Sequence, residues 1–562
     1  MVTRTHHTFL IMDLFPEILE EIFQYFCFDK VSLHSCVLVN RGWCKVAVPI
    51  LWKQPFLLLE NNISDKLIEV YASFITDEAY ATLLSQNISW PLKPFLKINQ
   101  TKTFIYPSFL RHFKYESLYL CLDLWYRNHL LNIQDDKIDK TKKTLFPYVH
   151  GSWVQKDYLN YTWLAPLYIE IFKVFLNCGA RFECLDLYSE QIYQPVDIRV
   201  LFKLPGIENC LSNLKELSPA TMERFTSIDY YSKLCRNVKS LKIESLRAGE
   251  STTISELIKA QVALEHIYIG TCTSHYFIQN TYGYSGSNKE LLIALLTQAS
   301  SLKSLEIKNL FINEIPSFNS KQITWDNLES LTIYYDNHYN LMKMPFGTKH
   351  FPKLQKLYIR QNTFPTDLIE FIQNTNISLK EIHLILRFQS GDISNVIQCI
   401  SNFCTNLVHF ESTVDFNAIP ALFSLLQSCK NLIHLSILNP FTPYTEDDYR
   451  MLSAFLPSNL RNLILITNYK DITDESFGIF LQHLHVKLDY LDLSQSKRMS
   501  CQVLDVLLES AKMNKYRFPK KILISTNPVD YSDKTEKLCK LEALGIQLIK
   551  NDDLLANCFV CD

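Results

Sequence analysis

Residues 302–307 read Leu-Lys-Ser-Leu-Glu-Ile, residues 328–333 read Leu-Glu-Ser-Leu-Thr-Ile, and residues 354–359 read Leu-Gln-Lys-Leu-Tyr-Ile. The same Leu-x-x-Leu-x-Leu/Ile form starts near residues 238, 264, 379, 432, 460 and 488, with a degraded copy at 407. Most successive copies lie 25–28 residues apart. Alternating apolar and polar residues over such a short run predict a β-strand with one buried face.

The segments between these strands predict helices, over 289–299, 416–428 and 502–512 for example, because Leu, Ile and Phe recur there at helical spacing. One strand and one helix cannot bury their own apolar face, so the copies must stack on one another. The chain therefore resembles the leucine-rich-repeat family, whose repeats are about 20–29 residues long. The resemblance implies an α/β fold, a curved solenoid with parallel strands on its concave face and helices on its convex face.

A doubly wound α/β domain is the alternative fold. It explains neither the fixed period nor the scarcity of glycine, with 12 residues in 562. One gap between copies is 38 residues long, and its excess lies around 274–288. We interpret this insertion as a length variant rather than a loop that grips a partner. Further strands are predicted at 182–187, 521–524 and 546–549.

A second pattern occupies residues 12–53, which read MDLFPEILEEIFQYFCFDKVSLHSCVLVNRGWCKVAVPILWK. Apolar residues at helical spacing predict a helix over 14–26, a second over 33–38, and a third after Asn40, whose side chain can cap it. Three short helices cannot close a large core. The apolar surface that they leave over predicts a site for a partner.

This block resembles an F-box, whose pattern is Leu-Pro-x-Glu-Ile-Leu-x-x-Ile-Phe, then Leu-x-x-Cys-x-x-Val, then Arg-x-Trp and a closing Leu-Trp. Phe15 stands where the pattern has its proline, with Pro16 one place later, and Asn40 replaces the usual Cys before the Arg. An ordinary three-helix cap is the alternative. The resemblance implies docking on a Skp-type adaptor through Leu14, Pro16, Glu17, Ile18, Leu19, Ile22, Phe23, Leu33, Val39, Arg41, Trp43, Leu51 and Trp52.

These patterns divide the chain into three parts. We predict an F-box at 10–53, a helical linker with atypical early repeats at 54–180, and the repeat solenoid at 181–562. Within the linker, residues 67–84 and 168–178 are patterned as helices and residues 118–122 as a strand.

The composition excludes several classes of protein. The net charge is −2, from 56 Lys and Arg against 58 Asp and Glu, so the basic footprint of a nucleic-acid-binding protein is lacking. The sequence contains no apolar run of the roughly 18 residues that indicate a membrane span. We expect the 16 cysteines of so long a chain to be reduced thiols, which predicts a cytoplasmic or nuclear protein.

The sequence carries no motif for catalysis. It lacks Gly-x-Ser-x-Gly, phosphate-loop and His-Glu-x-x-His sequences. Cys558 and Cys561 form a pair without the second pair that a structural zinc site needs, and His483 and His485 lack ligand spacing on one element. We therefore predict no enzyme activity, no metal site and no cofactor. An enzyme site hidden within 54–237 is the alternative.

The function then follows from the architecture. In a leucine-rich solenoid, the polar residues that alternate with core leucines face the concave side. We predict that a protein substrate binds there, through Glu306, Lys308, Thr332, Tyr334, Tyr358, Arg360, Glu381, His383, His409, Glu411, His434, Tyr490 and Asp492.

An F-box joined to such repeats is similar to the substrate receptors of Skp–cullin–F-box ubiquitin ligases, which reach the cullin and RING subunits through the adaptor. A scaffold that binds the adaptor or other proteins without delivering a substrate is the alternative. The sequence names neither the substrate nor a small-molecule co-receptor.

Overall fold

The computed structural model describes residues 15–56, 66–85, 103–133, 164–188, 196–220, 228–246, 250–271, 288–310, 324–334, 351–360, 365–375, 378–386, 392–439, 445–467, 474–493, 501–513, 518–524 and 531–550. The chain divides into two compact units. The first comprises residues 1–244 and 256–264, and the second comprises residues 245–255 and 265–562. The division cuts through helix α12 (Ser251–Lys259), and it also assigns the last two residues of the strand Ser240–Leu246 to the second unit.

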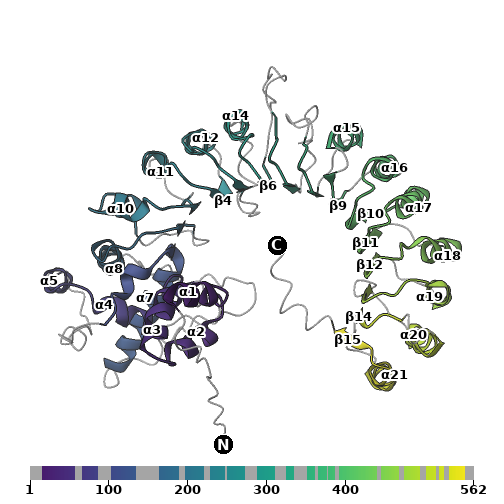
Figure 1. The fold of residues 1–562 in the computed structure, drawn as a ribbon, viewed down its shortest axis with the longest axis horizontal. Helices are drawn as coiled ribbons and strands as arrows, with labels where there is room; N and C mark the ends of the chain where they lie inside the picture. The colour runs from purple at the N-terminus through teal and green to yellow at the C-terminus, as the bar shows by residue number, and fades with distance from the viewer. Residues whose placement is uncertain are drawn as a thin grey trace, which may run out of the picture. The chain divides into compact units, whose positions relative to one another are not determined.

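Three helices begin the first unit (Figure 1): α1 (Pro16–Gln24), α2 (Lys30–Val37) and α3 (Arg41–Leu51). Proline is tolerated at the start of α1, where its missing N–H would have no helical partner. Asp29 caps α2, because its Oδ1 accepts a hydrogen bond from Ser32 N at 3.0 Å. Asn40 caps α3 as predicted, and its Oδ1 accepts from Trp43 N at 2.8 Å.

The rest of the first unit mixes helices with short strands. Its strands β1 (His112–Lys114), β2 (Cys184–Asp186), β3 (Glu216–Ser218) and β4 (Ser240–Leu246) pair in chain order, and every pair is parallel. The other elements are α4 (Lys66–Ala72), α5 (Asp77–Ser85), η3 (Tyr106–Phe109), α7 (Tyr115–Ile133), α8 (Ala165–Asn177), α9 (Ile198–Phe202), α10 (Ile207–Leu211) and α11 (Ile228–Leu234).

Aromatic side chains hold this region together. The ring of Phe113 from β1 stacks on Phe182 with centroids 5.3 Å apart, and meets Phe172 of α8 edge-on at 5.2 Å. Tyr71 of α4 packs edge-on against Phe175 at 4.8 Å. Offset and edge-on aromatic pairs add about 0.5–1.5 kcal/mol each beyond the burial of their area. The segment after the three helices is therefore a packed body built around β1, α4 and α8.

One of the predictions for this region was wrong. Residues 118–122 are not a strand but part of α7. The buried residues of this stretch recur at helical spacing, at Leu118, Tyr119, Leu122 and Trp125. A window of only five residues cannot distinguish such a helix from a buried strand. The helical pattern predicted over 67–84 corresponds to two helices, α4 and α5. The predicted helix at 168–178 corresponds to α8, and the predicted strand at 182–187 contains β2.

Within its described residues, the second unit repeats a strand and, in most copies, a helix. Its strands are β5 (His266–Thr271), β6 (Ser304–Lys308), β7 (Ser330–Tyr334), β8 (Lys356–Arg360), β9 (Glu381–Ile385), β10 (His409–Thr413), β11 (His434–Asn439), β12 (Asn462–Thr467), β13 (Tyr490–Leu493), β14 (Lys521–Ile524) and β15 (Gln547–Lys550). Its helices are α14 (Lys289–Thr297), α15 (Pro365–Thr375), α16 (Asp392–Phe403), η8 (Phe416–Ala418), α17 (Ile419–Ser428), α18 (Glu446–Phe455), α19 (Asp474–His483), α20 (Cys501–Met513) and α21 (Tyr531–Ala543).

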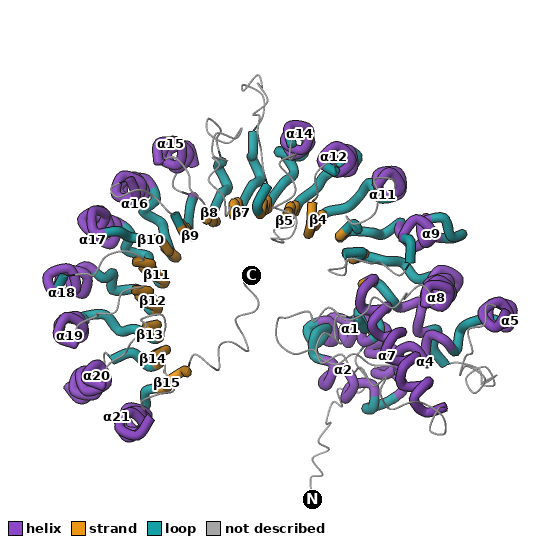
Figure 2. The backbone as a smooth tube through the Cα atoms, turned by 180° about the vertical axis from the view of Figure 1, so that it is seen from behind, coloured by secondary structure: helices purple, strands orange, loops and turns teal. Residues whose placement is uncertain are grey.

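Within this unit, consecutive strands from β5 to β15 pair with each other in parallel. Within this unit the strands follow the inner side of an arc and the helices its outer side (Figure 2). The α/β class, the parallel strands and the side on which the helices lie are as predicted. The predicted final strands at 521–524 and 546–549 correspond to β14 and β15.

The core of the second unit lies between strands and helices. Along β6, β7 and β9, burial alternates residue by residue, with the inward apolar residues fully covered and the polar residues between them partly exposed. Leu305, Ile307, Leu331 and Ile333 have no exposed surface. Covering each such side chain contributes about 1.5–3 kcal/mol, and β6, β7 and β9 each supply two of them. Stacking of copies therefore stabilises the unit.

Two features noted in the sequence lie outside the described residues. They are the insertion around 274–288, except its last residue, and the pair Cys558 and Cys561. The cysteines whose side chains are described are free thiols. Among the described helices, none combines the length and the apolar character needed to cross a membrane.

Candidate functional site

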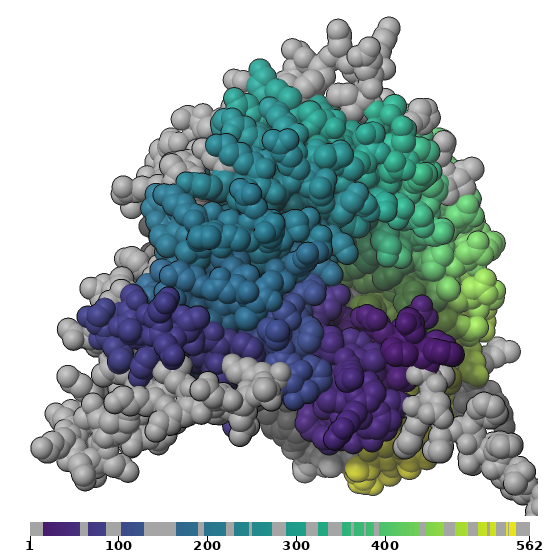
Figure 3. Space-filling model, turned by 60° about the vertical axis from the view of Figure 1, so that its left-hand side comes forward, coloured from purple at the N-terminus to yellow at the C-terminus, as the bar shows by residue number. Residues whose placement is uncertain are grey.

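The three-helix block leaves an unusual amount of apolar surface uncovered. Its core consists of Leu19, Phe23, Leu33, Ala47 and Ile50. The exposed apolar residues of the block range from Ile22 at 39% exposure to Tyr25 at 90%. They are Phe15, Ile18, Ile22, Tyr25, Phe28, Val31, Leu38 and Val39, and we refer to them as the apolar patch. Figure 3 shows part of the surface of this block in purple.

The predicted adaptor residues separate into groups by burial. Leu19, Phe23 and Leu33 are buried and hold the helices together, so they cannot touch a partner directly. Those that are exposed are Pro16, Glu17, Ile18, Ile22, Val39 and Arg41. Trp43, Leu51 and Trp52 are partly buried, and Leu14 lies outside the described residues.

Both tryptophans of the block have packing partners. Trp43 meets Phe23 edge-on, with ring centroids 5.1 Å apart. Trp52 lies 5.8 Å from Tyr71 and 4.5 Å from Tyr106, so it joins the block to the body that follows. The F-box resemblance did not point to Phe15, Tyr25, Phe28, Val31 and Leu38 of the apolar patch. The sequence could have identified them as large apolar residues that lie outside the buried face of a helix or at a helix end.

The strand face of the second unit carries the predicted substrate residues in three rows, because paired residues of neighbouring strands lie side by side. The first row runs through His266, Ser304, Ser330, Lys356, Glu381, His409, His434, Asn462, Tyr490, Lys521 and Gln547. The middle row runs through Tyr268, Glu306, Thr332, Tyr358, His383, Glu411, Ser436, Ile464 and Asp492. The third row contains Lys308, Tyr334 and Arg360.

Not all of these residues can meet in one site. Glu306 on β6 and Asp492 on β13 are seven strands apart, which at about 4.8 Å per strand is roughly 34 Å. The structure instead forms two local groups and a pair. Tyr490 and Asp492 are the pair, and the Tyr490 hydroxyl donates to Asp492 Oδ2 at 3.1 Å.

The first group is cationic and aromatic and lies on β6 to β8. The Arg360 guanidinium carbon lies 4.7 Å from the ring centroid of Tyr334, and Lys308 Nζ lies 5.7 Å from the same centroid. Lys308 Nζ also lies 3.9 Å from a carboxylate oxygen of Glu306. Cation–π contacts at exposed sites contribute about 0.5–1 kcal/mol each, so they orient these side chains rather than lock them.

The second group is a stack of imidazole rings on β9 to β11. His383 and His409 have ring centroids 4.3 Å apart, and His409 and His434 have centroids 5.1 Å apart with nearly parallel planes. Glu411 Oε2 lies 2.7 Å from His383 Nδ1. We call His383, His409, His434 and Glu411 the histidine cluster.

Neighbouring side chains support the histidine cluster. The Tyr358 ring lies 5.1 Å from the His383 ring, and Asn462 Nδ2 lies 2.7 Å from His434 Nδ1. Lys356 pairs with Glu381 at 2.9 Å beside the stack. Burial, and then the neighbouring imidazoles of His383 and His434, lower the pKa of His409 to about 4. His409 is therefore neutral near pH 7, with a ring nitrogen free to accept or to coordinate.

The sequence analysis did not predict the histidine cluster. Its members were each predicted to face outward, but their proximity was not. His383, His409 and His434 are 26 and 25 residues apart, which equals the repeat period. Repeats aligned in phase would have shown that these residues occupy adjacent strands.

A groove of about 780 Å³ lies beside the starting ends of β8 to β12. It was not predicted. Cationic and amide side chains line it, and no carboxylate does among the described residues. Those with charge or amide groups are Lys353, Gln355, Lys380, Asn406, Asn431, Asn459 and Arg461. Asn459 Nδ2 donates to Lys430 O at 3.0 Å, so one of these amides also ties two copies together.

No family model matches this chain, and no curated protein matches it in sequence. A solved structure that it resembles is the leucine-rich repeat-containing protein LegL7 from Legionella pneumophila, at 14% identity and a TM-score of 0.30. The match covers 58% of this chain and 87% of that chain. At this TM-score the likeness adds nothing to what the chain's own repeats show.

Proposed function

We propose that this chain is the substrate-recognition subunit of a Skp–cullin–F-box ubiquitin ligase. In this proposal the apolar patch of the three-helix block docks on a Skp-type adaptor, and through it on the cullin and RING subunits. The strand face of the second unit binds a protein substrate. The proposal includes a location in the cytoplasm or nucleus, and the free thiols of the described cysteines are compatible with such a reducing compartment.

The apolar patch is the observation that carries the proposal. Eight large apolar side chains are exposed within 25 residues, counted from Phe15 to Val39. Fully covering one such side chain contributes about 1.5–3 kcal/mol, so half of the patch offsets much of the roughly 4–15 kcal/mol that association costs. The F-box resemblance supports the adaptor as the partner, because Ile18, Ile22 and Val39 belong to both the pattern and the patch.

The strand face supports the substrate half of the proposal. Tyr334, Tyr358 and Arg360 are of the residue types that dominate binding energy at protein interfaces. In the proposed complex the chain holds its substrate near the conjugating machinery, and its contribution to the reaction is proximity and orientation.

The adaptor half is tested with two exposed residues of α1. The double variant Ile18→Asp with Ile22→Asp places charges on the patch and leaves the core residues of the block unchanged. We expect binding to a purified Skp-type adaptor to fall below detection. The change Leu19→Asp is unsuitable because Leu19 is buried and the block would unfold.

Val262→Asp is the matched control, since Val262 is 75% exposed but lies far along the chain from the block. We expect this variant to bind the adaptor like wild type, and circular dichroism should show the same helix content in all proteins. Wild-type affinity in the double variant would show that the docking assignment is wrong.

A scaffold that binds the adaptor without delivering a substrate remains the second candidate. The same two surfaces favour it, since neither of them by itself requires transfer of ubiquitin. Reconstituted ubiquitination of the co-purified partners separates the two. Modified partners are expected for the receptor, and unmodified partners for the scaffold.

A further inference from the structure

We propose that the histidine cluster binds a divalent transition-metal ion of the zinc class, with His383, His409 and Glu411 as its ligands. One ligand atom from each of these three residues lies within 4.8 Å of the other two. The inference does not depend on the role in a ubiquitin ligase, because it concerns only side chains of the strand face.

The donor set suits such an ion. Two imidazoles and one carboxylate make three protein ligands, and a zinc site of this kind keeps its fourth position for water or for a group from a bound molecule. Imidazole nitrogen also suits copper, nickel and iron, whereas magnesium and calcium prefer oxygen ligands alone. The ion is therefore expected from the borderline transition metals.

The geometry requires only a small adjustment. Ligand atoms around a tetrahedral zinc ion, with bonds of about 2.0–2.1 Å, lie roughly 3.4 Å apart. The present limit of 4.8 Å can close by rotation of side chains, since His383 and Glu411 retain 19% and 23% side-chain exposure. Solvent can therefore reach the site, and an ion can enter it from the strand face.

The backbone positions the three ligands rigidly. His383 of β9 and Glu411 of β10 are register partners, and His409 is two residues before Glu411 on the same strand face. Sites built on paired strands hold their ligands more accurately than sites on loops. His434 and Asn462 continue the first row beside His409, which places a further imidazole next to the proposed ion.

The test measures zinc bound by the full-length chain in a background that carries Cys558→Ser and Cys561→Ser, which removes the paired thiols of the tail. Equilibrium dialysis followed by elemental analysis counts the ions per chain. His409→Ala is expected to lose one equivalent. Glu411→Gln keeps the shape of the side chain but removes its charge, and it should lower the affinity for that zinc ion by at least about tenfold.

His266→Ala is the matched control, because His266 lies in the same row of the strand face on β5, away from the cluster. It should retain every equivalent of zinc. Cobalt offers a second readout, since Co²⁺ in a site with nitrogen ligands absorbs visible light, and this absorption should disappear in His409→Ala and persist in His266→Ala.

Two outcomes would overturn the proposal. The first is equal zinc binding by wild type, His409→Ala and Glu411→Gln. The second is an equal loss in His266→Ala, which would mean adventitious binding by surface histidines. If His409→Ala fails to fold, as judged by its melting temperature without metal, Glu411→Gln decides the result.

Discussion

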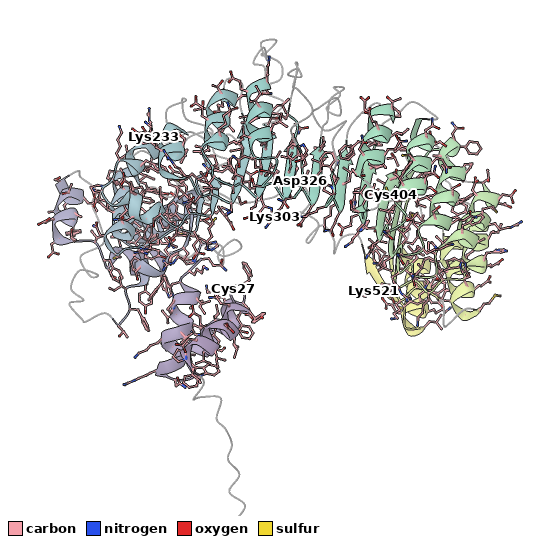
Figure 4. The ribbon with its side chains drawn as sticks, turned by 45° about the horizontal axis from the view of Figure 1, so that its top comes forward. Cys27, Lys233, Lys303, Asp326, Cys404 and Lys521 are labelled. Carbon is pink, nitrogen blue, oxygen red and sulfur yellow. The ribbon has the colours of Figure 1, made fainter. Side chains whose placement is uncertain are left out.

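At the scale of single residues, burial decides what each position does. Leu19 and Ile18 are neighbours in the F-box-like pattern, yet Leu19 is 3% exposed and Ile18 is 44% exposed. The first stabilises the block and the second is available to a partner. The same holds for cysteine, because Cys404 and Cys429 are buried and Cys429 Sγ donates to Cys404 O at 3.4 Å. Figure 4 labels Cys404 in the second unit.

Burial of these two thiols raises the pKa of Cys404 to about 12 and that of Cys429 to about 11. They are therefore poor nucleophiles near neutral pH. The Cys-x-Asn-Leu sequence shared by residues 404–407 and 429–432 is a structural repeat, in which the thiol fills the space between helix and strand.

His112 on β1 gives a prediction for the dependence of stability on pH. Its pKa lies below the usual value of about 6.5 because burial disfavours the charged ring. Lys53 and Lys215 act in the same direction, and Glu216 and Glu183 oppose them. Below pH 6.5 the unfolded chain binds the proton before the folded chain does, so stability that is present above 6.5 is lost as the pH falls toward the lowered value.

The melting temperature of the wild type is therefore expected to decrease on acidification below about pH 6.5, and His112→Gln should remove part of that decrease. His34→Gln on the exposed side of α2 is the control and should leave the slope unchanged. Identical slopes for wild type and His112→Gln would contradict the assignment.

At the scale of elements, caps and periodicity decide where helices begin. The cap of α3 was predicted from Asn40, and Asn40 Oδ1 accepts the hydrogen bond from Trp43 N. The strand predicted at 118–122 was wrong because its window covered too little of α7 to reveal the helical period. A short apolar run can be a helix or a strand, and only the pattern of the flanking residues distinguishes the two.

Removal of the Asn40 cap is predicted to lower the stability of α3. Asn40→Ala removes the acceptor for Trp43 N and should cost about 1 kcal/mol, within the range of about 0.5–2 for helix caps. Native-state hydrogen exchange of the amides in α3 should become faster. Asn40→Asp keeps an acceptor and should exchange like wild type. Equal protection in Asn40→Ala would mean that water or another group replaces the cap.

At the scale of the whole molecule, the proposed function requires two surfaces that act separately. The apolar patch belongs to the first unit, and the strand face lies in the second. Arg360→Glu reverses the charge of the cationic and aromatic group on the strand face. It should abolish capture of partners that depend on the strand face while adaptor binding stays at the wild-type level.

Quantitative mass spectrometry of co-purified proteins, with the proteasome inhibited, measures both sets of partners. The double variant at Ile18 and Ile22 should show the reverse pattern, with adaptor lost and strand-face partners retained. Lys512→Glu, an exposed residue of α20, is the control for a change of charge in the second unit. Loss of the same proteins in Arg360→Glu and in the α1 double variant would contradict the separation.

The sequence by itself determined the repeated strands and helices, because a period of about 25–28 residues and alternation within each copy are local properties of the chain. It also determined that the N-terminal block has more apolar residues than its own core can cover. These patterns depend only on which residues follow one another.

Only the tertiary structure decided which outward residues meet. Register across parallel strands brings His383, His409 and Glu411 together although they come from two copies, and it keeps Glu306 and Asp492 apart. It also decided which apolar residues of the block are buried, since that depends on how α1, α2 and α3 pack. Both outcomes depend on contacts between distant parts of the chain, which no local pattern records.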